Sequence, residues 1–258
     1  MTLPLLARTL APFDRLACAD ALVWLGTVPD ESVDLVVTDT AYESLEKHRA
    51  RGTTTRLKQS KASSNEWFPI FRNEKFPALF RELYRVLKPN THLYFLCDED
   101  TMWVARPIGE AAGFKYWKAL TWDKGSIGMG YHWRNRTERV LFFEKGKRRL
   151  NDLGAGDVLE VEDLAEPWLD DVIRAQRIRA GYPTEKPPAL AEKLIENSSA
   201  PGELVVDPFM GSGSVGYAAE ACGRRFAGCD IEPKAVALTK QRLCGDPEIS
   251  TVREGFFG

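Results

Sequence analysis

The chain has 258 residues, 44% of them hydrophobic and 28% charged, which suits one α/β domain of medium size or one domain with a modest insertion. No stretch approaches the roughly 18 consecutive apolar residues of a membrane span, and the first twenty residues carry no secretory pattern. The five cysteines form neither a CxxC pair nor a metal-ligand spacing. We therefore expect a cytoplasmic protein with reduced thiols, no membrane partner and no metal.

The formal net charge of −2 argues against a protein that coats nucleic acid indiscriminately, but the charges are unevenly distributed. One basic run contains no acid and consists of Lys47, Arg49, Arg51, Arg56, Lys58 and Lys61. A second basic cluster occupies residues 145–149, and acids dominate residues 157–171. Taken alone, each basic run fits a solvated loop as well as it fits a binding surface.

The predicted elements alternate between strands and helices along the chain. Short apolar runs predict strands at residues 33–38, 93–97, 118–122, 139–143, 204–206 and 226–229. Helical spacing of apolar residues predicts helices at 76–87, at 187–197 and at 233–243. This alternation indicates an α/β fold with a doubly wound, mostly parallel sheet covered on both faces.

Two segments depart from the alternation. Residues 43–75 are polar and too long for an ordinary connection, which predicts a functional loop. Residues 144–182 combine the second basic cluster with the acidic run and indicate an inserted element.

The most informative motif is glycine-rich. The strand at 204–206 runs into the segment 207–213, DPFMGSG, and then into a helical pattern. Gly211, Gly213 and Gly216 spell GxGxxG, and Asp230 follows about 20 residues later, where an acid can accept hydrogen bonds from ribose hydroxyls. Strand, glycines, helix and acid together predict a nucleotide-type cofactor site.

A nicotinamide dehydrogenase would carry the same fingerprint. After Gly216, however, the chain has room for one helix, one strand and a last helix, and not for the second half of a dinucleotide fold. The other strands must come from the N-terminal part of the chain. The sheet is therefore expected in permuted order, with its cofactor half last.

A second motif lies near the start of the chain. The strand at 33–38 ends in Asp39-Thr40-Ala41-Tyr42. A strand-terminal aspartate can simply cap a turn. In a doubly wound sheet, however, ligands bind beyond the carboxyl ends of the strands, which predicts that Asp39 and Asp207 share one edge.

These two motifs make the chain resemble the amino-group DNA methyltransferases, which act on adenine N6 or cytosine N4. Their target-amine motif, Asp/Asn/Ser-Pro-Pro-Tyr/Phe, is matched at residues 39–42, and their Asp-Pro-Phe-x-Gly-Ser-Gly motif is matched fully at 207–213. The order of the motifs resembles the permuted β class. The resemblance implies an S-adenosylmethionine-dependent methyltransferase fold with a catalytic half at 1–143, a target-recognition insertion at 144–182 and a cofactor half at 183–258.

The resemblance also implies roles at the amine site. Asp39 and the Thr40 carbonyl would accept the hydrogens of the target amine, with Ala41 completing the motif. Tyr42 would stack on a base flipped out of double-stranded DNA, although a core aromatic is the alternative interpretation. The segments 122–124 and 136–139 resemble motifs that wall the base pocket.

On the cofactor side, Asp230 would hold the ribose hydroxyls, with Glu232 as the weaker candidate. Asp20 would face the adenine amine, although a solvated aspartate at a helix start explains it nearly as well. Lys186 would orient the cofactor or cap a neighbouring loop. The full set of residues assigned to the cofactor is Asp20, Asp39, Lys186, Asp207, Pro208, Phe209, Met210, Gly211, Ser212, Gly213, Asp230 and Glu232. The basic run at 47–61 would contact DNA phosphates beside the flipped base.

Thr40 departs from the family pattern, because proline is common there and presents the carbonyl rigidly. Adenine N6 is the expected target, since Asp opens the amine motif. Cytosine N4, RNA, or a binding protein without turnover are the alternatives. Resemblance alone further implies a homodimer and a restriction endonuclease counterpart.

Overall fold

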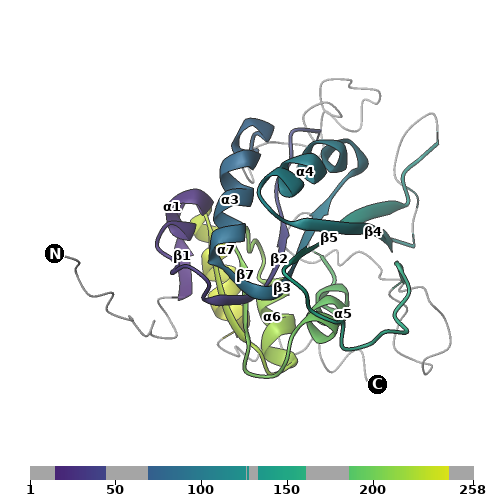
Figure 1. Cartoon of the computed structure of the whole chain (residues 1–258). Helices are drawn as coiled ribbons and strands as arrows, with labels where there is room; N and C mark the ends of the chain where they lie inside the picture. Colours follow the sequence, from purple (N-terminus) through teal and green to yellow (C-terminus); the bar gives the residue numbers. More distant parts are fainter. Residues whose placement is uncertain (1–14, 45–68, 126, 128–132, 161–185, 244–258) are drawn as a thin grey trace, which may run out of the picture.

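The computed structural model describes residues 15–44, 69–125, 127, 133–160 and 186–243 (Figure 1). Its centre is an eight-stranded sheet in the order β1-β8-β7-β2-β3-β5-β4-β6. Every strand runs in the same direction except β5, which is antiparallel to both of its neighbours. The strands are β1 Leu16–Cys18, β2 Val33–Asp39, β3 Leu87–Cys97, β4 Lys115–Asp123, β5 Thr137–Lys145, β6 Val158–Glu160, β7 Leu204–Asp207 and β8 Arg225–Asp230.

Helices cover both faces of this sheet (Figure 1). Helices α1, α3 and α4 pack on one face, and α5, α6 and α7 pack on the other. Helix α3 illustrates how a helix packs on the sheet through an apolar face. Its buried side chains form one apolar stripe that consists of Phe76, Leu79, Phe80, Leu83 and Val86. The helices are α1 Ala21–Leu25, η3 Asn73–Lys75, α3 Phe76–Val86, α4 Glu99–Ala111, α5 Pro188–Ser198, α6 Ser214–Ala221 and α7 Pro233–Leu243.

The chain changes direction across the sheet between β7 and β2. These two strands pair in parallel through Leu35 with Val205 and Val36 with Val206. From β7 the chain continues through α6 to β8 on one side, whereas from β2 it continues through α3 to β3 on the other. Such a switch point opens a crevice at the carboxyl ends of the strands, so the topology itself indicates where a ligand binds.

The predicted fold is confirmed, because all six predicted strands and all three predicted helices are present in a mostly parallel sheet. Strand β3 is longer than predicted and begins at Leu87, directly after α3. Strands β1 and β6 and helix α4 were not predicted, and α1 was anticipated only as the helix that Asp20 would cap. Within the expected insertion, residues 144–145 finish β5 and residues 158–160 form β6, which pairs in parallel with β4; residues 161–182 lie outside the described part of the chain.

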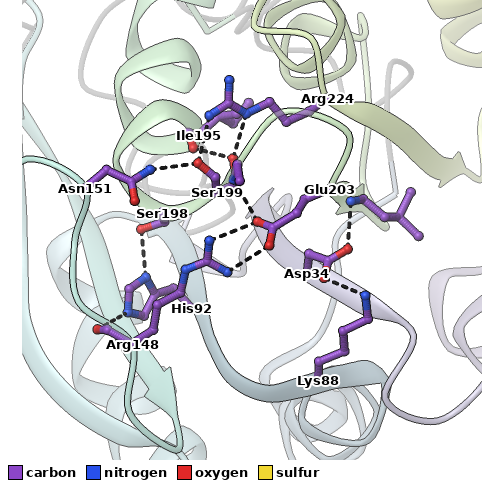
Figure 2. Close-up of polar contacts among 12 residues, drawn as sticks. Asp34, Lys88, His92, Arg148, Asn151, Ile195, Ser198, Ser199, Glu203 and Arg224 are labelled. Atoms are coloured by element: carbon purple, nitrogen blue, oxygen red, sulfur yellow. Dashed lines mark hydrogen bonds and ion pairs between the residues drawn. The ribbon is translucent and has the colours of Figure 1, made fainter.

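A cluster of polar side chains lies where the parallel strands begin, at the end of the sheet opposite to the carboxyl ends of the strands (Figure 2). The buried His92 ring lies 2.8 Å from Ser198 Oγ through Nδ1 and 3.2 Å from the Arg148 carbonyl through Nε2. Arg148 donates to both carboxylate oxygens of Glu203, and Lys88 pairs with the buried Asp34 at 2.6 Å. Arg148, from the second basic cluster, is thus part of the fold's own polar network.

Among the described residues, no helix is long and apolar enough to cross a membrane. The same residues contain no group of three or more His, Cys, Asp or Glu side chains that could hold a metal ion.

Candidate functional site

A cleft of about 520 Å³ opens at the carboxyl edge of the sheet, at the switch point between β7 and β2. Residues 39–42 and residues 207–212 both line it, so the two sequence motifs lie in one site as predicted. Its volume falls in the range typical of small-molecule sites, about 300–1,000 Å³. The cleft is therefore the candidate binding site of the molecule.

Asp207 ties the glycine loop to the neighbouring strand. Its side chain is buried, and Oδ1 accepts hydrogen bonds from Thr38 Oγ1 at 2.8 Å and from the Phe209 amide at 3.0 Å. Burial raises the pKa of this carboxyl from 3.8 to about 7, against the lowering effect of these hydrogen bonds. Asp207, which the resemblance assigns to the cofactor site, thus fixes the conformation of the glycine loop.

The loop itself needs glycine at Gly213. This residue is the N-cap of α6 and has a φ of 78°, in the left-handed region. A Cβ placed there would lie 2.7 Å from Thr239 Oγ1, which donates a 3.0 Å hydrogen bond to the Gly211 carbonyl. Any side chain at residue 213 would therefore disturb the contact between the loop and α7.

Two acids lie near the other end of the loop. Asp230 accepts hydrogen bonds from the Gly211 amide at 2.9 Å and from the Glu232 amide at 2.8 Å, and burial raises its pKa. Asp20 caps α1 by accepting from the Leu22 amide at 2.9 Å. Both acids line the cleft, whereas Glu232 is not among its lining residues. Asp20 thus caps a helix and also lines the cleft, so its role as a helix cap does not exclude a role in binding.

At the amine end, Asp39 is held by a lysine. Its Oδ2 atom forms an ion pair with Lys186 Nζ, while Oδ1 is buried and has no hydrogen-bond partner. Burial raises the pKa of Asp39, and the charge of Lys186 opposes this effect. Beside it, Thr40 is 2% exposed and its Oγ1 atom is also buried without a hydrogen-bond partner. Lys186, predicted to orient a cofactor or cap a loop, contacts the proposed catalytic acid.

Aromatic residues connect the two motifs. Tyr42 is 7% exposed, belongs to the hydrophobic core and also lines the cleft. The Phe71 amide donates a 2.7 Å hydrogen bond to the Ala41 carbonyl, and the Phe71 ring packs edge-on against Phe209 at 5.0 Å. Sequence reasoning missed Phe71, because it lies at the end of a polar segment; the apolar run at 67–71 was the available signal.

Further residues on the sheet complete the wall. Trp122 and Glu138 line the cleft near Asp39, where the resemblance placed a base pocket. The six basic residues expected to contact DNA all fall within 45–68, outside the described residues.

Comparisons with known proteins place the chain among DNA methylases. A family model, N6_N4_Mtase, described as DNA methylase, matches residues 33–241. The type II methyltransferase M.HpaI of Haemophilus parainfluenzae is 25% identical over 248 residues, covering 89% of this chain and 74% of that protein.

Solved structures share the fold. TTHA0409 of Thermus thermophilus, solved in complex with S-adenosyl-L-methionine, has a TM-score of 0.61 and 23% identity, covering 89% of this chain and 93% of that one. The cytosine-N4-specific PvuII DNA methyltransferase has a TM-score of 0.64 and 16% identity, covering 93% and 91%.

Proposed function

Because the chain belongs to the N6_N4_Mtase family of DNA methylases, we propose that it transfers a methyl group from S-adenosylmethionine to an exocyclic amino group of a base in double-stranded DNA, with adenine N6 as the target. One observation carries the proposal. Asp39 lines the same cleft as the glycine loop, and one of its carboxylate oxygens, Oδ1, is buried without a hydrogen-bond partner. A hydrogen-bond acceptor in that position suits the N–H groups of an incoming amine.

The residues of the cleft fit the cofactor. S-adenosylmethionine would supply an electrophilic methyl group bonded to a sulfonium sulfur, which would leave as a neutral thioether when the bond between sulfur and methyl carbon breaks. Asp230 and Asp20 offer carboxylate acceptors for hydroxyl and amine donors, and Phe209 and Met210 offer apolar walls. Gly211 lines the cleft and has no side chain, so its backbone permits close approach of a ligand.

Asp39 and Thr40 supply the chemistry on the protein side. An aromatic amine is a poor nucleophile because its lone pair is delocalised into the ring. If Asp39 Oδ1 and the Thr40 carbonyl accept its two hydrogens, the nitrogen lone pair becomes available for attack. The nitrogen gains positive charge as it takes the methyl group, the Asp39 carboxylate stabilises that charge, and Asp39 accepts the surplus proton. Its pKa, which burial raises, suits that last step.

Adenine N6 is preferred because an aspartate opens the amine motif, a leaning of the family. Cytosine N4 is the second candidate, since a cytosine-N4-specific enzyme shares the fold over 93% of this chain. We further propose that residues 47–61 contact DNA phosphates and that the insertion at 144–182 reads the target sequence through residues outside β5 and outside the polar network of Arg148. We also propose that the chain forms a homodimer and has a restriction endonuclease counterpart.

The test is direct. The protein is incubated with methyl-labelled cofactor and with DNA or RNA of mixed sequence in separate reactions, and the methylated nucleosides are then identified by mass spectrometry. N6-methyladenine supports the proposal, and N4-methylcytosine selects the second candidate. Label in RNA alone, or no label in any nucleic acid, would overturn the proposed function.

A further inference from the structure

Four charged side chains, one of which is Asp39, form a chain of contacts at the amine end of the cleft. Lys186 Nζ pairs with Asp39 Oδ2 and lies 3.5 Å from Glu138 Oε2, and Lys124 Nζ donates to Glu138 Oε1 at 3.2 Å. Two carboxylates thus alternate with two ammonium groups. Because the charges of the four groups sum to zero, the cluster needs no outside ion when it is shielded from water.

The register of the sheet brings these residues together. Asp39 lies opposite Leu96 of β3, Leu96 lies opposite Val140 of β5, and Glu138 is two residues from Val140 on the same face. This is the face that α5 covers, and Lys186 lies just before that helix. Glu138 therefore reaches Lys186 because β5 runs antiparallel to β3.

The cluster is tightly enclosed. The side chains of Lys124 and Lys186 are 8% and 15% exposed, and that of Glu138 is 17% exposed. The ring of Trp122, which lies opposite Glu138, is 5.9 Å from Lys186 Nζ. Glu138 Oε2, like Asp39 Oδ1, is buried without a hydrogen-bond partner. One acceptor on each carboxylate is therefore free of hydrogen bonds.

We propose that Glu138 is a positioning residue of the methyl-transfer site, which anchors Lys186 and offers it a second anionic partner when an amine approaches Asp39. This inference rests on the proposed function and deepens it. As the amine hydrogens reach the Asp39 carboxylate, the Lys186 ammonium shifts towards Glu138 Oε2, which lies 3.5 Å from Nζ, and closes that distance to an ordinary hydrogen bond. The charges of Lys186 and Lys124 lower the pKa of Glu138 and so favour its ionised form, and the negative charge of Glu138 lowers the energy of the Lys186 shift.

The neighbouring charges fix the expected pH effects. The groups acting on Asp39 are Lys186, Glu138 and Asp98, and Lys124 acts on Glu138. Removing the negative charge of Glu138 lowers the pKa of Asp39, because a like charge is lost. Removing the positive charge of Lys186 raises it, because an opposite charge is lost.

The experiment compares Glu138→Gln and Lys186→Gln with the wild type in steady-state methyl transfer across pH. For Glu138→Gln we expect kcat to fall about 10- to 100-fold, with the KM for DNA and the cofactor affinity little changed, since the interaction acts only as the amine docks. The acidic limb of the pH–rate profile should move to lower pH in Glu138→Gln and to higher pH in Lys186→Gln. Glu138→Asp, which keeps the charge, should recover part of the loss.

The matched control is Asp34→Asn. Asp34 is also a buried acid on the sheet that pairs with a lysine, Lys88, but it lies at the opposite end of β2 from Asp39. Asp34→Asn should lower thermal stability and leave kcat and the pH profile as in the wild type. An unchanged kcat in Glu138→Gln, or equal losses in Glu138→Gln and Asp34→Asn, would overturn the proposal.

A measurement without turnover separates this proposal from the proposed function. The Asp39 carboxyl carbon is titrated by ¹³C NMR in the wild type and in both glutamine variants. Opposite displacements of the Asp39 pKa support the cluster even in a protein that methylates no DNA. The same pKa in all three proteins refutes the role of Glu138 whether or not the wild type is active.

Discussion

Replacing Asp207 by asparagine should stabilise the cofactor-free protein at alkaline pH. The Asp207 side chain is 3% exposed, and burial raises its pKa from 3.8 to about 7. Asparagine has nearly the same shape and keeps an oxygen that can accept from Thr38 Oγ1 and the Phe209 amide, so the main change is the loss of a buried charge.

The sign follows from proton linkage. Because the folded-state pKa of Asp207 is raised, its contribution to the free energy of unfolding is fully present below about pH 4 and is lost as the pH rises through about 7. Between pH 5 and pH 7 this loss amounts to about 3 kcal/mol, from about 1.4 kcal/mol per pH unit. Asp207→Asn lacks this loss, so its advantage over the wild type should grow by about 3 kcal/mol from pH 5 to pH 8.

The assay is urea unfolding of both proteins, without cofactor, at several pH values from 5 to 8. Taking the difference between the two proteins cancels the titration of every group that Asp207 does not influence, His92 included. A difference in the free energy of unfolding that stays constant with pH would refute the assignment of a raised pKa to Asp207. If the free energy of unfolding of the wild type instead rose relative to that of the variant as the pH rises, the pKa of Asp207 would be lowered rather than raised.

Three further predictions concern other parts of the chain. Burial lowers the pKa of His92 from 6.5 to about 4. In urea titrations, the free energy of unfolding of the wild type relative to that of His92→Gln should therefore fall by about 3 kcal/mol from pH 7 to pH 4. A difference between the two proteins that does not change with pH would contradict this. Gly213→Ala, whose Cβ would lie 2.7 Å from Thr239 Oγ1, should lower the free energy of unfolding by about 2–4 kcal/mol and abolish cofactor binding in calorimetry. Its control Gly223→Ala, with a φ of 73° and nothing within 4 Å, should cost only about 1–2 kcal/mol, and equal losses would argue against the clash. Thr40→Pro should raise the rate of methyl transfer to DNA, because proline fixes the backbone that presents the carbonyl of residue 40. An unchanged or lower rate would refute the hypothesis that Thr40 impairs the enzyme.

The sheet could be predicted from the sequence because its central strands are continuous apolar runs. Strand β2 is buried at six of its seven positions, which leaves an unmistakable pattern. Helix α4 was missed because its fully buried residues, Thr101, Ala105 and Gly109, are small and leave no apolar stripe in the sequence. Its larger apolar side chains are only partly buried, and Pro107 lies inside the helix. Strand β1 has three residues, all at least partly exposed.

The site could be predicted only where strand ends carry motifs. The carboxyl ends of parallel strands meet at one edge, and this rule placed Asp39 and Asp207 in one cleft from the sequence alone. The contact between Lys186 and Glu138 depends on the register of β5 against β3 and on the entry into α5, and neither is written in local sequence. The partner of Asp39 was therefore beyond sequence reasoning, although Lys186 itself was singled out.

The most direct test is the single-turnover rate of methyl transfer by Asp39→Ala at saturating cofactor. Alanine removes every acceptor that this side chain offers to the amine, whereas asparagine, which the family motif admits at this position, would keep one. We expect a rate at least about 100-fold below that of the wild type, since one preorganised electrostatic contact is worth about 10²–10³ in rate. A variant that methylates DNA at the wild-type rate would contradict the assignment of Asp39, and with it the function proposed for the cleft.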